Sequence, residues 1–237
     1  MHKALVTGGS KGIGLSIAHS ILADGGHVMI TGRDHTRLDA AVSELVASAG
    51  DPTRVASAAV DVRDRAAVDA LVLDTAERFG GLDTLINNAG VGAFSEIGSM
   101  TDEDWDRTIA TNLTGVFYCT RAALPQLRRA GGGWIINIAS LAGRNYFAGG
   151  GAYCASKAGL IAFSESLMLE VRYDDIRVSV VMPGSVATEF SGHMPGSGED
   201  WKLSPDDVAE VVMDLIKHPA RSLPSRVEIR PSKPKKG

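Results

Sequence analysis

Short apolar runs alternate with segments of helical periodicity along the whole chain, and this alternation restricts the possible folds more than any other feature. The apolar runs, each a predicted strand, are residues 4–7, 27–31, 55–60, 82–86, 134–139, 176–182 and 227–229. Between most of them, apolar residues recur every three to four positions, as in helices that cover a sheet. Strands that alternate with helices predict an α/β fold with a parallel sheet. No internal repeat or linker interrupts the pattern, so we expect residues 1–237 to form a single domain.

A glycine-rich turn joins the first predicted strand to the first predicted helix. Its sequence is Gly8-Gly9-Ser10-Lys11-Gly12-Ile13-Gly14. Glycine lets a backbone approach a ligand closely, and the free N–H groups at a helix N-terminus attract a pyrophosphate. The spacing, Gly-x3-Gly-x-Gly, differs from the Gly-x-Gly-x-x-Gly of the common dinucleotide fingerprint. On its own, this turn is explained as well by a plain tight turn as by a nucleotide site.

The end of the second predicted strand indicates which dinucleotide the chain binds. An enzyme that uses NAD usually places a carboxylate there to bond the ribose hydroxyls. Here the strand is followed by Gly32-Arg33-Asp34, so glycine stands where the acid is expected and a cation follows. Lys11 offers a second cation. We therefore predict NADP(H) as the preferred cofactor and NAD(H) as the lesser alternative. In a competing interpretation Asp34 caps the next helix and Arg33 is merely exposed.

Tyr153 and Lys157 stand four residues apart in a predicted helix, so their side chains share one face. A tyrosine hydroxyl has a pKa of about 10, and a neighbouring cation favours the phenolate, which moves the group toward acid-base use. Ser140 follows a buried strand and would point into the ligand crevice of an open α/β sheet. Taken alone, a Tyr–Lys pair on a helix is more often a packed ring beside a solvated amine.

Small and polar residues at other strand ends complete the predicted cofactor site. Asp61-Val62 follows the third strand, where the carboxylate either accepts a hydrogen bond from an adenine amino group or caps a helix. Asn88-Ala89-Gly90 follows the fourth strand, where the backbone must pass close to a ribose. Pro183-Gly184 ends the sixth strand. Val186 and Thr188 lie just beyond it, in position to meet a nicotinamide carboxamide.

Two other segments suggest function by their composition. Residues 102–130 are largely helical with a break near Asn112, whose amide could hold a water or a backbone carbonyl. Residues 189–202 are rich in Gly, Ser and Pro and lack apolar periodicity, which predicts a lid or substrate loop. Candidate residues for the substrate pocket are Phe94, Arg144, Tyr146, Phe147, Met182 and Trp201.

The overall charge and the chain ends narrow the class of partner. A net charge of −4, with no basic block apart from Lys233, Lys235 and Lys236, argues against nucleic acid. The N-terminus has no signal-peptide pattern and no apolar stretch approaches 18 residues, so we expect a cytoplasmic protein without a membrane partner. Cys119 and Cys154 lack a metal-ligand spacing, and we expect no metal site.

Together these features resemble the short-chain dehydrogenase/reductase superfamily from end to end. The resemblance is carried by Thr7-Gly8 with Gly12-Ile13-Gly14, Asn87-Asn88-Ala89-Gly90, Asn112, Ser140, Tyr153 with Lys157, and Pro183-Gly184. It implies one Rossmann-type domain with a seven-stranded parallel sheet and helices on both faces. It gives Tyr153 the role of general acid and base, and Lys157 the task of lowering its pKa and holding the nicotinamide ribose. Ser140 would bond the substrate oxygen, and Asn112 would support a water relay behind Lys157.

The function that we predict is NADP(H)-dependent interconversion of a carbonyl and an alcohol on a small or medium, fairly apolar substrate. The resemblance also implies a homodimer or homotetramer. Two alternatives stay open. One is an NADP-dependent dehydrogenase of a hydroxy amino acid or polyol, for which Arg144 is the obvious charged anchor. The other is a non-catalytic NADP(H)-binding regulatory module.

Overall fold

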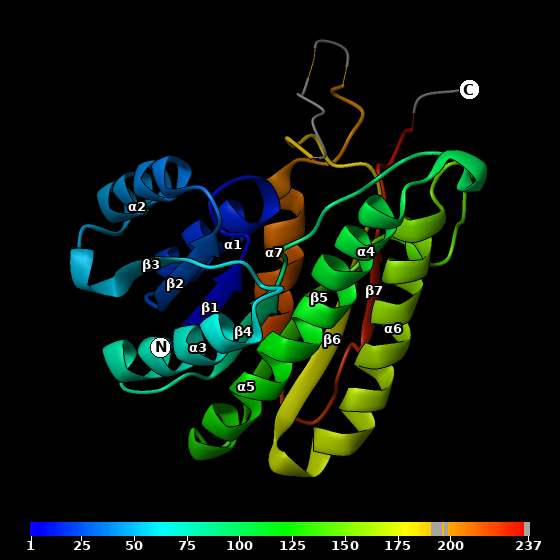
Figure 1. Ribbon diagram of the computed structural model, residues 1–237. Coiled ribbons are helices and arrows are strands. Elements are labelled where there is room, and N and C mark those ends of the chain that lie inside the picture. The colour runs from blue at the N-terminus through cyan, green and yellow to red at the C-terminus, as the bar shows by residue number, and fades with distance from the viewer. Residues whose placement is uncertain (191–195, 197–198, 235–237) are drawn as a thin grey trace.

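Seven parallel strands form one sheet. Figure 1 shows the computed structural model of the protein, which describes residues 1–190, 196 and 199–234. The strand order is β3-β2-β1-β4-β5-β6-β7. The strands are β1 (Lys3–Thr7), β2 (His27–Gly32), β3 (Val55–Ala59), β4 (Thr84–Asn87), β5 (Gly133–Ile138), β6 (Ile176–Pro183) and β7 (Arg226–Ile229). Every predicted strand is present, with bounds that differ by two residues at most. The predicted α/β fold with a seven-stranded parallel sheet is confirmed.

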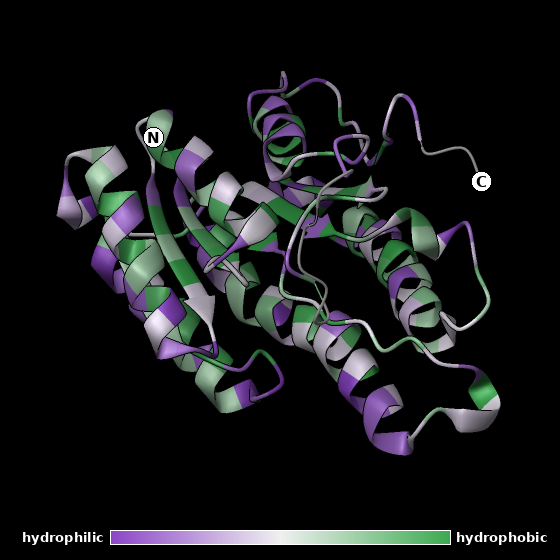
Figure 2. Ribbon diagram, turned by 90° about the horizontal axis from the view of Figure 1, so that it is seen from above, coloured by the Kyte–Doolittle hydropathy of each residue, from purple (hydrophilic) through white to green (hydrophobic). Residues whose placement is uncertain are grey.

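Helices cover both faces of the sheet because the central strands are apolar on both sides. Ala4 and Val6 of β1 face one core, and Leu5 between them faces the other. The first face carries α1 (Gly12–Ala23), α2 (His35–Ala49) and α7 (Pro205–Ile216); the second, in the foreground of Figure 1, carries α3 (Arg65–Phe79), α5 (Gly115–Arg129) and α6 (Gly151–Val171). Figure 2 shows the hydrophobic residues concentrated along the strands, between these helix layers. In the part of the chain described, no helix is long and apolar enough to cross a membrane.

Side-chain caps fix the start of several helices and settle one open question from the sequence. Asp34 caps α2 by accepting a hydrogen bond of 3.1 Å from the Arg37 N–H, so the capping interpretation of Asp34 is right. Ser204 begins α7 with a full capping box. The cap of α3 is Asp64, not Asp61. The Asp61 carboxylate is therefore left at the end of β3 with no helix to cap.

The strand order places a crevice between β1 and β4. After β1 the chain turns to α1 on one face of the sheet, and after β4 it turns toward α5 on the other face. The loops that follow these adjacent strands therefore diverge. In open α/β sheets, ligands bind at this switch point, outside the carboxyl ends of the strands. The fold thus brings the glycine turn after β1 and the Asn88-Ala89-Gly90 segment after β4 to one place.

Gly133 is a position where the sheet itself requires glycine. Its φ is +152°, and a Cβ there would lie 2.1 Å from the Asp83 carbonyl oxygen. We predict that Gly133→Ala lowers the free energy of unfolding by about 2–4 kcal/mol, because strain at positive φ adds to overpacking against backbone. Gly98→Ala is the control, since a Cβ at Gly98 meets nothing within 4 Å. Urea denaturation of the two variants tests this, and equal stability would contradict it.

Candidate active site

A cleft of about 1000 Å³ opens at the switch point and collects residues from across the chain. Of the predicted cofactor and catalytic residues, it is lined by Gly8, Ser10, Lys11, Gly12, Ile13, Arg33, Asp61, Val62, Asn88, Ala89, Gly90, Ser140, Tyr153, Lys157, Pro183, Gly184, Val186 and Thr188. Gly14 and Asn112 are not among the lining residues and lie behind its wall. Segments as far apart in sequence as residues 8–13 and 183–188 therefore form one surface.

Thr7 and Asn88 join the two loops that form the floor of the cleft. The Thr7 hydroxyl oxygen accepts from the backbone N–H groups of Asn88 and Ala89, each at 3.0 Å. In return the Asn88 amide donates to the carbonyl oxygens of Thr7 and Gly8, also at 3.0 Å. These bonds hold the ends of β1 and β4 together while the chain diverges.

The glycine turn has the features needed to hold a pyrophosphate. Helix α1 begins at Gly12, and its N-cap, Lys11, makes no capping hydrogen bond through its side chain. The first turn carries no acidic residue, so its N–H groups and the helix dipole favour an anion. A Cβ at Gly14 would lie 2.4 Å from the Gly8 carbonyl oxygen, so only glycine allows this turn to close. A dinucleotide phosphate fits this cradle.

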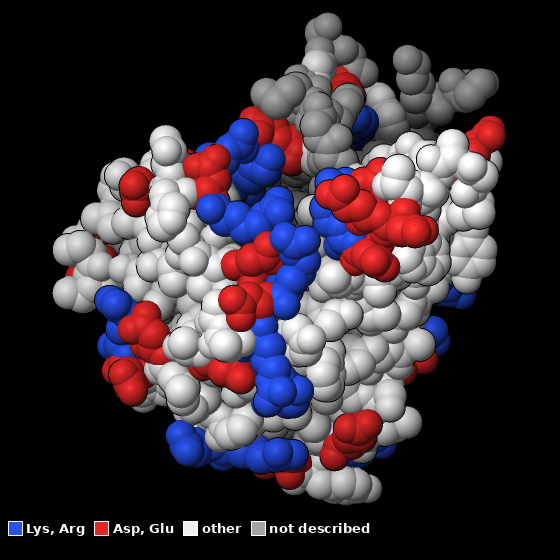
Figure 3. Space-filling model, in the orientation of Figure 1, with Lys and Arg blue, Asp and Glu red and all other residues white. Residues whose placement is uncertain are grey.

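Basic and acidic side chains gather at the end of the cleft next to β2 and β3. Figure 3 shows Lys and Arg interleaved with Asp and Glu between α2 and the short helix α4 (Asp102–Ile109). Lys11, Arg33 and Arg37 all line the cleft. Arg37 was not predicted, although it stands four residues after Arg33. Glu189 bridges Lys11 and Arg37, at 3.2 Å and 2.7 Å.

Asp61 makes a different contact from the one expected at the adenine. Its carboxylate accepts from the Arg63 guanidinium at 2.6 Å and from the Arg63 backbone N–H at 3.0 Å. These hydrogen bonds hold the pKa of Asp61 below its ordinary value. The carboxylate still lines the cleft, but an adenine amino group would share it with Arg63.

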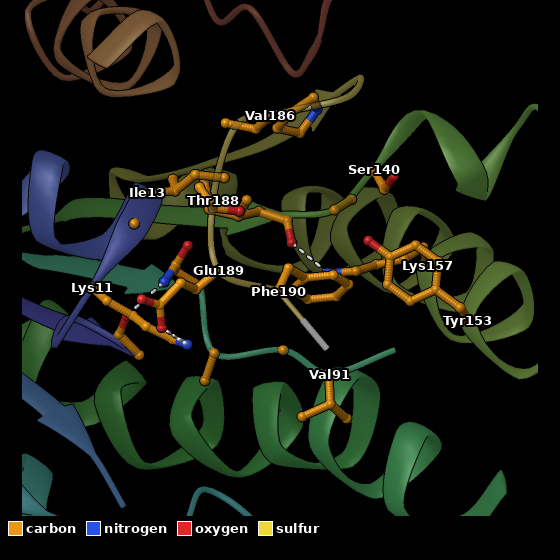
Figure 4. Close-up of a pocket in the computed structure, with 18 of the residues that line it drawn as sticks. Lys11, Ile13, Val91, Ser140, Tyr153, Lys157, Val186, Thr188, Glu189 and Phe190 are labelled. Atoms are coloured by element: carbon orange, nitrogen blue, oxygen red, sulfur yellow. Dashed lines mark hydrogen bonds and ion pairs between the residues drawn. The ribbon is translucent and has the colours of Figure 1, made fainter. Parts of the chain in front are cut away.

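Ser140, Tyr153 and Lys157 meet at the opposite end of the cleft, and Figure 4 shows them together on one side of the pocket. Ser140 follows β5 and caps a short 3₁₀ turn (Leu141–Gly143), its hydroxyl accepting from the Ala142 N–H at 3.1 Å. Tyr153 and Lys157 lie one turn apart on α6. The buried Lys157 amine donates to the Ile138 carbonyl oxygen at 2.8 Å and lies 5.8 Å from the centre of the Tyr153 ring.

Burial opposes the ionised form of both groups. It raises the pKa of Tyr153, while a hydrogen bond with Ser140 lowers it. It also lowers the pKa of Lys157 from the ordinary 10.5 to about 8. The expectation that Lys157 pulls the pKa of the phenol down is thus opposed by desolvation in the free protein. An amine with a pKa of about 8 is still mostly protonated at pH 7.

Asn112 sits in the predicted break of the helical region, which is a π-helical turn (Ala110–Thr114) between α4 and α5. Its amide donates to the Val91 carbonyl oxygen and accepts from the Val91 N–H, both at 2.8 Å, and donates to the Ser156 hydroxyl at 3.0 Å. The widened turn of a π-helix is common at functional sites. Here it ties the loop after β4 to the helix that carries Tyr153.

Aromatic side chains surround the phenol of Tyr153. Phe94 and Phe190 make edge-on contacts with its ring, with centroids 5.5 Å and 5.8 Å away, and Phe147 packs on Phe94 at 6.0 Å. Trp201 is another aromatic residue that lines the cleft. Phe190 was not singled out from the sequence. Aromatic rings therefore pack beside the polar groups of Ser140, Tyr153 and Lys157 at this end of the cleft.

Three residues proposed for the pocket lie elsewhere. Arg144 does not line the cleft and instead pairs with Glu228 at 2.8 Å. Tyr146 is 70% exposed outside the cleft, and Met182 is buried in the core between β6 and α6. Another cation, Arg230 of the C-terminal segment, does line the cleft.

The C-terminal segment and the predicted substrate loop both reach this cleft. Pro231 and Pro234 line it together with Arg230. Of the predicted loop 189–202, the stretches 191–195 and 197–198 lie outside the described residues. Of its described residues, Glu189, Phe190, Trp201 and Lys202 line the cleft.

The chain is similar to known oxidoreductases over nearly its full length. It is 37% identical to the NADP-dependent 3-hydroxy acid dehydrogenase of Salmonella typhi, over 96% of this chain and 94% of that protein. A structure of alcohol dehydrogenase from Thermococcus sibiricus complexed with 5-hydroxy-NADP superposes with a TM-score of 0.90 at 30% identity, covering 98% of each chain. A closed form of serine dehydrogenase complexed with NADP⁺ gives 0.85 at 34% identity, covering 95% of this chain and 93% of that one.

The sequence profile of the short chain dehydrogenase family matches residues 2–195 of the chain. That span includes the glycine turn, Ser140, Tyr153 and Lys157, which the cleft brings together. The chain belongs to the short-chain dehydrogenase/reductase family.

Proposed function

We propose that this protein is an NADP(H)-dependent carbonyl reductase that acts on substrates with an apolar substituent, and the reverse alcohol oxidation uses the same site. The observation that carries the proposal is the arrangement of one cleft. Ser140, Tyr153 and Lys157 converge at its aromatic end, and cations that suit a phosphate gather at the other. Family membership makes the chain an oxidoreductase, which leaves the non-catalytic binding module without support.

The cofactor site favours NADP(H) on charge. Strand β2 ends with Gly32, at the position where enzymes that use NAD usually have a carboxylate, and Lys11, Arg33 and Arg37 line the same cleft. Cations in place of an acid suit a ribose 2′-phosphate. The solved relatives that hold NADP⁺ or 5-hydroxy-NADP support this preference.

Each catalytic side chain has a task that follows from its position. When bound, NADP(H) supplies the hydride for reduction. The Tyr153 hydroxyl donates its proton to the substrate oxygen, which gains electron density as its carbon is reduced. The Ser140 hydroxyl donates a hydrogen bond to the same oxygen, and the Lys157 ammonium stabilises the phenolate that remains. Asn112 is a positioning residue that fixes the wall behind Lys157 through Val91.

The substrate end of the cleft supports an apolar substrate. Phe94 and Phe190 contact the ring of Tyr153, and two further cations that line the cleft, Arg230 and Lys202, have acidic partners. Arg230 pairs with Glu228 at 2.7 Å, and Lys202 with Glu199 at 2.5 Å. A substrate carboxylate would have to compete for them. A hydroxy acid dehydrogenase is the second candidate, because Arg230 lines the cleft and two relatives are named for such substrates.

We also propose a cytoplasmic homo-oligomer. Cys119 and Cys154 are free and buried, which suits a reducing compartment. Cys119 faces the core rather than an interface, but Phe117 of α5 and Leu169 of α6 are 42% and 59% exposed. These apolar side chains support an interface on the face of α5 and α6.

Removing the phenolic hydroxyl is the direct test of the proposed chemistry. We predict that Tyr153→Phe lowers kcat for an aldehyde or ketone with NADPH by about 10²–10⁴-fold, because the proton donor is lost while the ring keeps its aromatic contacts. NADPH affinity should change little. Tyr146→Phe, on an exposed tyrosine outside the cleft, should leave kcat unchanged. Full activity in Tyr153→Phe across a carbonyl panel would refute the proposal.

Arg230→Met separates the two candidate substrate classes. For apolar aldehydes and ketones we predict a kcat/KM within about threefold of wild type, because no charge on the substrate contacts this residue. A hydroxy acid that binds Arg230 would instead lose about 10-fold or more, as expected for a lost charge-assisted hydrogen bond. Arg144→Met is the matched control, since Arg144 shares Glu228 as its partner but lies outside the cleft.

Because the amine of Lys157 is buried, we expect that replacing it removes activity and raises the free energy of unfolding. Its pKa is about 8 when folded and 10.5 when unfolded, so below pH 8 the folded protein buries a charge. That cost is about 3 kcal/mol at 1.36 kcal/mol per pKa unit, and it disappears as pH rises from 8 to 10.5, where only the unfolded chain keeps the proton. We predict that Lys157→Met is inactive yet more stable than wild type at pH 7 by about 1–3 kcal/mol, after loss of the hydrogen bond to Ile138.

Denaturation of both proteins at pH 7 and pH 10 measures this difference. The advantage of Lys157→Met should shrink at pH 10, since the wild-type amine is then neutral in the folded state. A variant that is less stable than wild type at pH 7 would contradict the prediction.

A further inference from the structure

The Glu189 carboxylate forms ion pairs with Lys11 and Arg37, the cations that would bind a ribose 2′-phosphate. One oxygen of its carboxylate, Oε2, accepts from the Arg37 guanidinium at 2.7 Å and from the Lys11 amine at 3.2 Å. All three residues line the cofactor cleft. Figure 4 shows Glu189 beside Lys11, at the end of the cleft away from Ser140 and Tyr153. A single carboxylate thus joins the loop after β6 to the glycine turn and to α2.

We propose that the Glu189 carboxylate competes with the 2′-phosphate of NADP(H) for Lys11 and Arg37, so that the chain carries an internal mimic of that phosphate. This inference rests on the proposed NADP(H) function. In the proposed site Glu189 weakens the binding of the 2′-phosphate and leaves the affinity for the rest of the nucleotide unchanged. Glu189 is a specificity-determining residue in this view.

The chemistry of the two groups makes them exclusive partners. A phosphate monoester carries a charge of about −1.5 to −2 at pH 7 and presents three acceptor oxygens, whereas a carboxylate carries −1 and presents two. Both need the same donors, and two anions at contact distance repel each other. Hydrogen bonds from Arg37, and then from Lys11, lower the pKa of Glu189, so this side chain is ionised at neutral pH. The phosphate must therefore displace a charged competitor.

Arg33 offers the 2′-phosphate a first contact that Glu189 does not block. Among the described residues no carboxylate forms an ion pair with Arg33, although its charge acts on Asp61, and Arg33 lines the same cleft. A phosphate can approach Arg33 while Glu189 still holds Lys11 and Arg37. The exchange then needs only a rotation of exposed side chains, because Glu189, Lys11 and Arg37 are 33%, 46% and 48% exposed.

Calorimetric titration with two nucleotide fragments tests the competition without turnover. The fragments are adenosine 2′,5′-bisphosphate and adenosine 5′-monophosphate, which differ only in the 2′-phosphate. We expect Glu189→Gln to bind the bisphosphate about three- to tenfold more tightly than wild type, the size of the exposed ion pairs that no longer compete. Affinity for the monophosphate should stay within twofold. Circular dichroism checks that the exposed substitution leaves the fold intact.

Glu228→Gln is the matched control. Glu228 also bridges two cations, Arg144 and Arg230, at 2.8 Å and 2.7 Å, but it does not line the cofactor cleft. The Glu228→Gln substitution removes the same charge as Glu189→Gln. If both variants gained equally in affinity for the bisphosphate, the gain would be a general charge effect and the inference would be overturned.

The remaining outcomes separate this inference from the proposed function. If wild type prefers the bisphosphate and Glu189→Gln binds it no more tightly, competition is refuted and the NADP(H) preference stands. Weaker binding in Glu189→Gln would mean that the carboxylate orients the two cations, which also refutes competition. If no variant distinguishes the two fragments, the NADP(H) preference fails together with the inference.

Discussion

The hydrogen bonds of the Thr7 and Asn88 side chains join the loops after β1 and β4 at the floor of the crevice, and the rest of the site is built on this junction. Adjacent parallel strands β1 and β4 send the chain to opposite faces, so their loops diverge and leave backbone groups without ladder partners. Unpaired buried backbone groups are costly. The Thr7 hydroxyl and the Asn88 amide satisfy four of them across the gap. The sheet can therefore stay continuous below while a ligand site forms above.

The amine of Lys157 is buried, and this burial lowers its pKa. Lys157 is 4% exposed and lies between the end of β5 and the ring of Tyr153. The same low dielectric that makes its charge costly also strengthens its effect on a nearby phenolate. Burial also raises the pKa of Tyr153, so the low-dielectric surroundings act on both groups. The burial that opposes the charge on each group is thus also the condition under which the two groups influence each other most strongly.

Features set by local sequence could be predicted, and features set by distant contacts could not. The glycine turn, the break near Asn112 and the pairing of Tyr153 with Lys157 follow from spacings of a few residues, and the structure has each of them. Strand ends facing one edge placed Ser140 and Thr188 in the same cleft. The bond of Glu189 to Arg37 spans 152 residues, and that of Arg144 to Glu228 spans 84. No periodicity encodes such pairs, so Arg144 was assigned to a pocket that Arg230 enters instead.

The division between rigid and variable parts explains why the reaction is easier to infer than the substrate. Ser140 and Lys157 are fixed by β5 and α6, and their chemistry depends on that framework. The wall around the substrate comes from loops and ends, with Phe94 after β4, Phe190 after β6 and Arg230 after β7. Loops can change without disturbing the sheet. Relatives named for a 3-hydroxy acid, an alcohol and serine are accordingly all 30–37% identical to this chain. Overall identity therefore reports the shared framework and does not by itself name the substrate.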